Sequence, residues 1–360
     1  MNDSLYRRKN HAIQVGNVKI GGDAPISIQS MTNTDSHDFE ATYKQMKALE
    51  EAGCDIVRLT LPDLDACETV KRLKKTDLKI PLVADIHFDY RIALAAADAG
   101  IDKIRINPGN IGADERVRVV ADKCKERHIP IRIGINSGSL EKSILEKYGS
   151  PTPEALAESA MYHAKLLEKF DFGDIAISIK SSNVRTMIEA NRIVASACNY
   201  PLHIGVTEAG RGNAGMLKSA IGIGTLLCEG IGDTIRVSLT DDPVKEIEAG
   251  RSILRACGCS TENYINIVSC PTCGRTKIDL IHICKILEER LKDISVQRKI
   301  TVAVMGCVVN GPGEAAEADI GIAGGKGEGL LFSHGKILRR IPEEKLIDEL
   351  IQEIKKIAQI

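Results

Sequence analysis

Two hydrophobic periods alternate along the first two-thirds of the chain. Short runs rich in β-branched residues are separated by segments in which apolar residues recur every three or four positions, as on one face of a helix. The strand-like runs are Ser27–Thr32, Asp55–Leu61, Pro81–Ile86, Lys103–Pro108, Ile129–Ile135, Asp174–Lys180, Pro201–Thr207 and Thr234–Thr240. The helical segments include Phe39–Ala52, Ala113–Arg127, Pro153–Lys169 and Pro243–Ala256.

This alternation predicts the fold of the first part of the chain. Eight strand–helix units in about 230 residues are the count and length of a (β/α)8 TIM-type barrel. A doubly wound open sheet is the structural alternative. Val15–Ile20 and the turn at Gly21 and Gly22 are expected to form a hairpin that closes the barrel floor.

The pattern changes after Cys257–Gly258–Cys259. The order that follows predicts a small α+β domain. Its segments are a strand at Asn263–Ser269, a helix at Ile278–Leu291, a strand at Lys299–Met305, a glycine-rich stretch at Gly321–Gly329, a short strand pair, and an amphipathic helix at Pro342–Ala358. We therefore divide the chain into a substrate-binding barrel, residues 1–258, and an α+β domain, residues 259–360.

Composition excludes some classes of protein. The chain has 360 residues and a formal net charge of −1, which argues against a nucleic-acid or membrane-surface binder, since these carry a basic excess. No apolar run approaches the roughly 18 residues that a membrane helix needs, and Met1–Gln14 is charged rather than signal-like. We expect a cytoplasmic protein.

Charged residues gather at the carboxyl ends of the predicted strands, where β/α barrels build their active sites. The cations at these ends are Arg58, Arg105, Arg132, Lys180 and Arg236. Asp85 and His87 follow the third strand, Glu208 follows the seventh, and the amides of Asn107 and Asn136 lie just beyond the fourth and fifth.

Five cations at one mouth repel one another unless negative charge neutralises them. Asp85 and Glu208 supply two negative charges, so a substrate with two or more phosphate charges is indicated, and the arginine fork suits phosphate oxygens. Structural ion pairs are the alternative for each arginine. The G-x-G-x-x-G stretch Gly210–Gly215 fits the phosphate loop of a barrel, or else a plain tight turn.

The tail domain carries a cysteine pattern typical of a metal or cluster site. Cys270 and Cys273 form a C-x-x-C turn after one predicted strand, and Cys307 follows another. Glu314 is the candidate fourth ligand, and a replaceable carboxylate favours a catalytic iron–sulfur cluster. Two alternatives remain open: a C-x-x-C redox disulfide, and a structural zinc site that also uses Cys257, Cys259 or Cys284.

Taken together, these motifs resemble the 4-hydroxy-3-methylbut-2-enyl-diphosphate synthase family over essentially the whole chain. The resemblance is carried by Gln29–Thr34, Val83–Phe88, Arg105–Asn110, Arg132–Gly138, Cys270–Thr276 and Met305–Glu314. No extra domain lies between barrel and tail, as in the shorter bacterial members.

The resemblance implies a [4Fe–4S] cluster on Cys270, Cys273, Cys307 and Glu314. It also implies reductive opening and dehydroxylation of 2-C-methyl-D-erythritol 2,4-cyclodiphosphate, with electrons from flavodoxin or ferredoxin. Diphosphate holders are then Arg58, Arg105, Arg132, Lys180 and Arg236, with Asn107 and Asn136 beside them. Glu208 is the leading acid–base candidate, and Asp85 and His87 orient substrate or relay a proton. The family's head-to-tail homodimer is expected as well, because a short linker leaves the barrel at its floor.

Two rival functions follow from the same residues. One is a barrel transferase of the pteroate-synthase kind, with zinc in the tail. The other is an iron–sulfur electron carrier, although a carrier has no need of a cationic barrel mouth.

Overall fold

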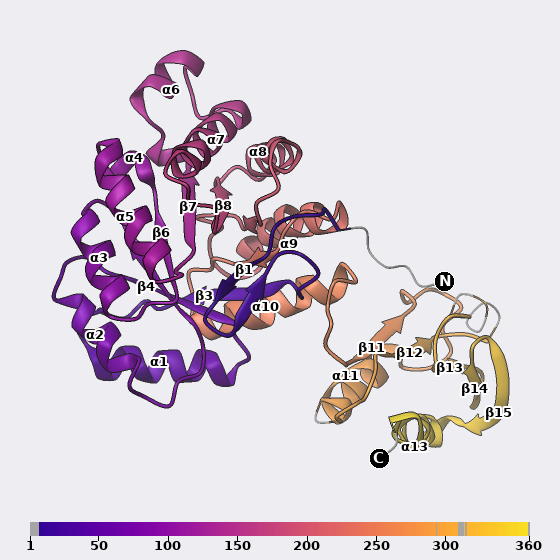
Figure 1. The fold of residues 1–360 in the computed structure, drawn as a ribbon. Coiled ribbons are helices and arrows are strands. Elements are labelled where there is room, and N and C mark those ends of the chain that lie inside the picture. The colour runs from indigo at the N-terminus through magenta and orange to yellow at the C-terminus, as the bar shows by residue number, and fades with distance from the viewer. Residues whose placement is uncertain (1–6, 293, 309–312, 314, 359–360) are drawn as a thin grey trace. The chain divides into compact units, whose positions relative to one another are not determined.

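The structure is a computed structural model that describes residues 7–292, 294–308, 313 and 315–358. The chain divides into two compact units, Met1–Ser260 and Thr261–Ile360. Each unit is built around a sheet of its own, and each is described separately below (Figure 1).

Unit 1 is the predicted barrel. Its eight strands lie in the order β8-β7-β6-β5-β4-β3-β10-β9, all paired in parallel, and a bridge between Ile177 and Leu202 joins the two ends. The strands are β3 (Ser27–Met31), β4 (Ile56–Thr60), β5 (Leu82–Ile86), β6 (Lys103–Ile106), β7 (Ile131–Asn136), β8 (Ile175–Lys180), β9 (His203–Ile204) and β10 (Thr234–Ile235). The (β/α)8 prediction is confirmed, and the doubly wound sheet is excluded.

Helices cover the outside of the barrel (Figure 1). They are α1 (Phe39–Glu51), α2 (Ala66–Leu73), α3 (Tyr90–Asp98), α4 (Pro108–Ile111), α5 (Asp114–Glu126), α6 (Lys142–Tyr148), α7 (Pro153–Lys169), α8 (Val184–Ala197), α9 (Gly212–Cys228) and α10 (Pro243–Ala256), with a 3₁₀ turn at Ser137–Ser139. Local capping explains sharp starts such as that of α7, where the Thr152 side chain accepts a hydrogen bond from Ala155 N and Pro153 opens the helix.

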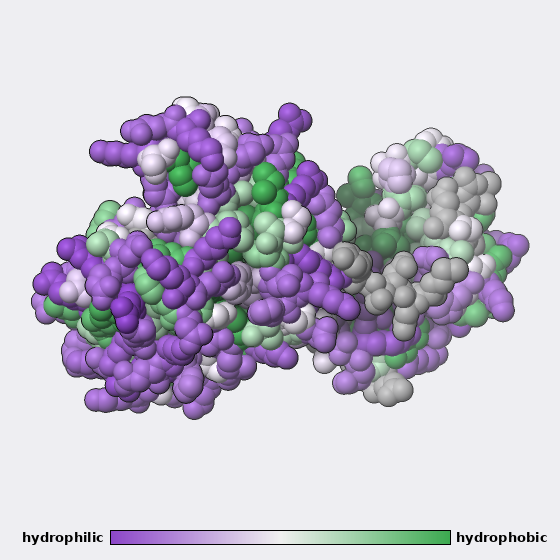
Figure 2. All heavy atoms as spheres, turned by 45° about the horizontal axis from the view of Figure 1, so that its top comes forward, coloured by the Kyte–Doolittle hydropathy of each residue, from purple (hydrophilic) through white to green (hydrophobic). Residues whose placement is uncertain are grey.

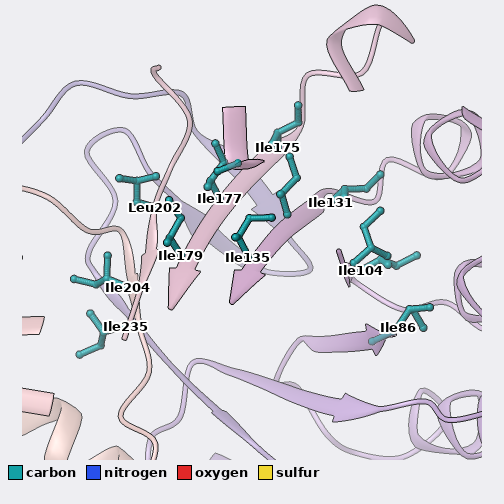
Figure 3. Close-up of a cluster of buried hydrophobic side chains, with 14 of the residues drawn as sticks. Ile86, Ile104, Ile131, Ile135, Ile175, Ile177, Ile179, Leu202, Ile204 and Ile235 are labelled. Carbon is teal, nitrogen blue, oxygen red and sulfur yellow. The ribbon is translucent and has the colours of Figure 1, made fainter. Parts of the chain in front are cut away.

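The two faces of each strand have different roles. Outward-facing isoleucines of neighbouring strands form a continuous apolar layer beneath the helices, including Ile104, Ile135 and Ile177 (Figure 3). Inward-facing side chains at the floor are apolar, and there Ile56, Val83 and Ala176 pack against a two-stranded hairpin. A hairpin is confirmed here, but it consists of β1 (Ile13–Val15) and β2 (Val18–Ile20) and turns at Gly16 and Asn17 rather than at Gly21 and Gly22. Above the floor the barrel interior is polar.

Two strands are shorter than predicted. Only His203–Ile204 and Thr234–Ile235 keep strand pairing, although longer apolar runs surround them. Close backbone approach explains the end of β9, because a Cβ on Gly205 would lie 2.4 Å from the carbonyl oxygen of Arg236. At the end of β9, this close backbone contact determines the path of the chain more than the hydrogen bonds between strands do.

Unit 2 contains a five-stranded mixed sheet, in the order β11-β12-β13-β14-β15. Its strands are β11 (Ile265–Ser269), β12 (Ile300–Met305), β13 (Ile320–Gly324), β14 (Glu328–Ser333) and β15 (Lys336–Pro342), and its helices are α11 (Leu280–Leu291) and α13 (Leu346–Ala358). The first three strands are parallel and the last two antiparallel. Most of the glycine-rich stretch Gly321–Gly329 is strand, since it includes the end of β13 and the start of β14. A Cβ on Gly321 would meet the Phe332 ring at 2.6 Å.

The surface in view in Figure 2 is mostly hydrophilic. Within the described residues, none of the helices combines the length and the apolar character needed to span a membrane.

Candidate active site

A cavity of about 260 Å³ opens at the carboxyl ends of the barrel strands. Its lining is polar and cationic. The lining residues are Met31, Arg58, Thr60, Asp85, His87, Arg105, Asn136, Ser178, Lys180, Thr207, Arg236 and Ser238. Four of the five predicted strand-end cations thus share one cavity, together with Asp85, His87 and Asn136.

Asp85 organises two of these cations. Its strand β5 pairs with β6 so that Asp85 lies beside Arg105, and Arg105 Nη1 donates to Asp85 Oδ1 at 2.9 Å. Arg58 Nη1 lies 3.6 Å from the other carboxylate oxygen. Burial alone would raise the pKa of Asp85, but Arg58 and Arg105 outweigh it and hold the pKa well below its usual range. Asp85 is therefore a permanent anion that fixes two guanidinium groups.

A glycine makes room for Arg105. A Cβ built on Gly134 of the adjacent strand would lie 2.2 Å from Arg105 Nε, closer than real atoms approach. The Gly134 carbonyl accepts from Arg105 Nη2 at 3.2 Å. In the amide orientation that satisfies donors and acceptors, Asn136 Oδ1 also accepts from Arg105 Nη2, at 3.1 Å. Arg105 is thus held from three sides.

The second carboxylate of the mouth is Glu246, which sequence reasoning missed. It lies on the buried face of α10, and its two oxygens are 3.3 and 3.4 Å from Arg236 Nε and Nη2. Ser30 Oγ and the backbone N–H of Leu239 also donate to it, at 2.8 and 3.1 Å. The one sequence signal was a charged residue among the apolar positions of that helix.

Lys180 lines the cavity from β8 and is buried. Burial, followed by the positive charges of Arg236 and Arg58, lowers the pKa of Lys180 well below its ordinary value. The mouth therefore holds more positive charge than its own carboxylates can balance. A bound anion would reverse this effect.

Arg132 occupies a deeper layer than the sequence predicts. It is 0% exposed, is absent from the cavity lining, and contacts His203 Nδ1 through Nη1 at 3.1 Å. Its Nε and Nη2 find no partner in the described part of the chain, and neither does Gln29 Nε2. Lys103, a cation that sequence reasoning missed, is also buried in the barrel interior, where burial and Arg132 lower its pKa.

Two further predicted residues lie apart from the cavity lining. Asn107 is buried and its amide donates to the carbonyl and the hydroxyl of Ser139, both at 3.2 Å, which joins the loops after β6 and β7. Glu208 is exposed, next to the lining residue Thr207, and has a φ of 51°. A left-handed backbone is costly for a non-glycine residue and is often retained at functional loops.

The stretch Gly210–Gly215 includes the start of α9, at the mouth end of the barrel. A Cβ on Gly215 would lie 2.6 Å from the carbonyl oxygen of Gly210, which also accepts from Thr240 N at 3.1 Å. The glycines thus serve a tight turn. This geometry leaves the phosphate-loop role untested.

In unit 2, two of the predicted thiol ligands follow neighbouring parallel strands. Ser269 of β11 is in register with Val304 of β12, so Cys270 and Cys307 follow the same edge of the sheet. The N–H of Gly306 donates to Cys270 Sγ at 3.2 Å. A hydrogen bond from the backbone of Arg275 lowers the pKa of Cys273, which favours the thiolate that a metal needs.

The other candidate ligands are Glu314, Cys284, Cys257 and Cys259. Glu314 lies outside the described residues. Within the described ranges, no three Cys, His, Asp or Glu side chains converge at metal-binding distance. Burial, with a smaller contribution from the nearby Cys270, raises the pKa of Cys284 on α11, whereas Cys257 and Cys259 belong to unit 1.

Fold and site together define a (β/α)8-barrel protein with a cationic mouth braced by two carboxylates, followed by a separate unit that carries Cys270, Cys273 and Cys307.

Comparison with known proteins shows to which family this barrel protein belongs. Residues 10–251 match the family model "GcpE TIM-barrel domain", and residues 266–356 match "GcpE protein C-terminal domain". The chain therefore belongs to the GcpE family and is an enzyme of it.

Curated relatives match this chain over its full length. A Clostridium perfringens protein named 4-hydroxy-3-methylbut-2-en-1-yl diphosphate synthase (flavodoxin) is 61% identical, covering 98% of this chain and 100% of that protein. A protein of the same name from Geobacillus kaustophilus is 55% identical, covering 100% of this chain and 95% of the relative. The family resemblance drawn from the sequence motifs is confirmed.

The similarity to a solved structure concerns only the barrel fold. A Plasmodium falciparum HPPK-DHPS with pterin and p-hydroxybenzoate matches with a TM-score of 0.52 and 13% identity, covering 70% of this chain and 49% of that one. At this identity the likeness concerns the fold.

Proposed function

We propose that the barrel mouth binds 2-C-methyl-D-erythritol 2,4-cyclodiphosphate, which this enzyme reductively opens and dehydroxylates to 4-hydroxy-3-methylbut-2-enyl diphosphate. The observation that carries the proposal is the charge of the cavity. Four cations line it, and Asp85 and Glu246 supply two negative charges, which leaves 4 − 2 = 2 positive charges. A cyclic diphosphate is a dianion of matching charge.

Each mouth residue has a proposed role. Arg58, Arg105, Lys180 and Arg236 hold the diphosphate oxygens. Asp85 fixes Arg58 and Arg105, since its low pKa argues against proton donation at neutral pH.

Residues around and beneath this set are proposed to support it. His87 in the lining and Glu208 beside it remain the candidates for proton delivery. Asn107 and Asn136 order the loop and the guanidinium beside the substrate. Arg132 supports the cavity from the layer beneath it, through its buried positive charge.

We further propose that Cys270, Cys273 and Cys307 hold a [4Fe–4S] cluster, with Glu314 as the fourth ligand. Three features fit this group: three soft sulfur donors, a Gly306 N–H directed at Cys270 Sγ, and the lowered pKa of Cys273. When bound, the cluster supplies electrons one at a time to the substrate. Cys284 and a zinc ion are the competing assignment.

The proposed partners follow from the relatives and from the chain path. Flavodoxin stands in the relatives' name, and we propose it, or a ferredoxin, as the electron donor here. We also propose a head-to-tail homodimer, for reasons given in the Discussion.

Turnover tests the reaction itself. Protein purified without oxygen should convert the cyclodiphosphate to the linear diphosphate when a chemical reductant replaces the carrier, as followed by chromatography. Unchanged substrate in the presence of protein with a full iron content would contradict the proposal.

The phosphate site is tested by Arg105→Ala. Loss of one charge-assisted contact is expected to weaken cyclodiphosphate binding by about 1.5–3 kcal/mol, measured by calorimetry, while cluster colour persists. Lys218→Ala is the matched control, because Lys218 is exposed on α9 outside the cavity. Equal affinities in the two variants would place the phosphate elsewhere.

Gly134→Ala tests the packing that positions Arg105. The added methyl would displace a guanidinium that Asp85 also holds, so substrate affinity should fall, with a steric cost of about 1–3 kcal/mol. Gly138→Ala introduces the same methyl where nothing lies within 4 Å, and it should bind substrate normally. Normal binding by both variants would show that Arg105 has room to move.

A further inference from the structure

Three cysteines of unit 1 that the barrel chemistry does not use lie where α9 and α10 end. Cys228 is the last residue of α9, Cys257 caps α10, and Cys259 follows two residues later. Cys228 is exposed, and the other two are partly buried. They precede Thr261, the first residue of unit 2.

The end of α10 rests on the last turns of α9. Cys257 Sγ lies 3.8 Å from the carbonyl oxygen of Gly224, and only 3.5 Å from the position that a Cβ on Gly224 would take. Cys228 is four residues beyond Gly224, on the same face of the helix, and helix side chains lean back toward the preceding turn. This geometry directs the Cys228 thiol toward Cys257.

Cys259 is directed elsewhere. Its thiol donates to the carbonyl oxygen of Cys257 at 3.6 Å, so it folds back on the helix end. The packing of the end of α10 on α9 therefore directs Cys228 and Cys257, rather than Cys228 and Cys259, toward each other.

We propose that Cys228 and Cys257 are an oxidisable dithiol, converted by a low-molecular-weight disulfide into a disulfide that ties helix α9 to the start of the inter-unit linker. The exposed Cys228 thiolate attacks one sulfur of the small disulfide, which breaks its S–S bond and releases one small thiol. Cys257 then attacks Cys228 Sγ and releases the second.

The step balances in atoms and electrons. Two protein thiols lose two electrons and two protons, and the small disulfide gains them as two free thiols. Burial, followed by the neighbouring Cys228, raises the pKa of Cys257 to about 12, which fits its place as the second, resolving thiol. The bond would fix residue 257, from which the linker leaves unit 1.

The test uses the full chain with its cluster, oxygen excluded, and glutathione disulfide as the probe. Remaining thiols are alkylated at once in denaturant, and the protein is cut with trypsin and a glutamate-specific protease. We expect a peptide pair joining residues 219–229 to residues 256–262, which a reducing agent separates. The readout needs neither activity nor a particular ligand set for the cluster.

Three variants decide which sulfurs are joined. Cys228→Ser and Cys257→Ser should lose the linked pair, whereas Cys259→Ser should keep it. A link that persists in Cys257→Ser, or a wild-type protein in which residues 219–229 carry only glutathione, would overturn the proposal. Iron content should be the same in all three variants, because none of these cysteines is a proposed cluster ligand.

Discussion

Replacing Cys270, Cys273 or Cys307 by serine is expected to remove the proposed iron–sulfur cluster and with it all turnover above background. The reason is chemical: a hard hydroxyl with a high pKa replaces a soft thiolate, and a cluster that keeps only two cysteine ligands is poorly held. The change should appear as lost iron and lost visible absorption in protein purified without oxygen.

The matched controls are cysteines of the barrel. Cys54 is buried and its thiol donates to the Ile56 carbonyl at 3.2 Å, a hydrogen bond that serine can also make. Cys67→Ser is a second control. Iron content should stay normal in both. Equal iron loss in the controls, or zinc in place of iron in the wild type, would contradict the ligand assignment.

The barrel could be predicted because its strands have one uniformly apolar face. Ile104, Ile133 and Ile177 point toward the helices, and their neighbours along each strand point inward, so β-rich runs stand out against helical periodicity. Strand length was harder to predict. Close backbone contacts such as that of Gly205 with Arg236 depend on three-dimensional approach, which no local pattern records.

The mouth cations were predictable for a similar reason. Charges at strand ends violate the apolar rule for a barrel core, and the ends of parallel strands meet at one rim. Glu246 could not be predicted in this way, because it reaches the mouth from helix α10. On a helix, a single charged residue looks like one that faces solvent. The sequence also placed Arg132 in the mouth layer, but strand register alone does not give depth, and this side chain is fully buried.

The proposed dimer rests on the path of the chain out of the barrel. Helix α10 follows β10 and runs back along the outside of the barrel, so it ends on the floor side, opposite the mouth. Residues 257–260 then lead to unit 2. Four residues at about 3.3–3.6 Å each reach no more than about 15 Å, whereas strands of six residues already span about 20 Å from floor to mouth. We therefore propose that the cluster unit of one subunit serves the mouth of its partner.

Mixing two inactive variants tests this arrangement. Arg58→Ala/Lys180→Ala disables the mouth, Cys307→Ser disables the cluster, and each protein alone is expected to be inactive. After subunit exchange, equal amounts give about half mixed dimers, each with one intact composite site, so roughly a quarter of wild-type activity should return. Mixing Arg58→Ala/Lys180→Ala with Arg105→Ala/Arg236→Ala should restore nothing, since both lack a mouth. If mass spectrometry shows mixed dimers of the first pair and they stay inactive, the mouth and the cluster must meet within one chain.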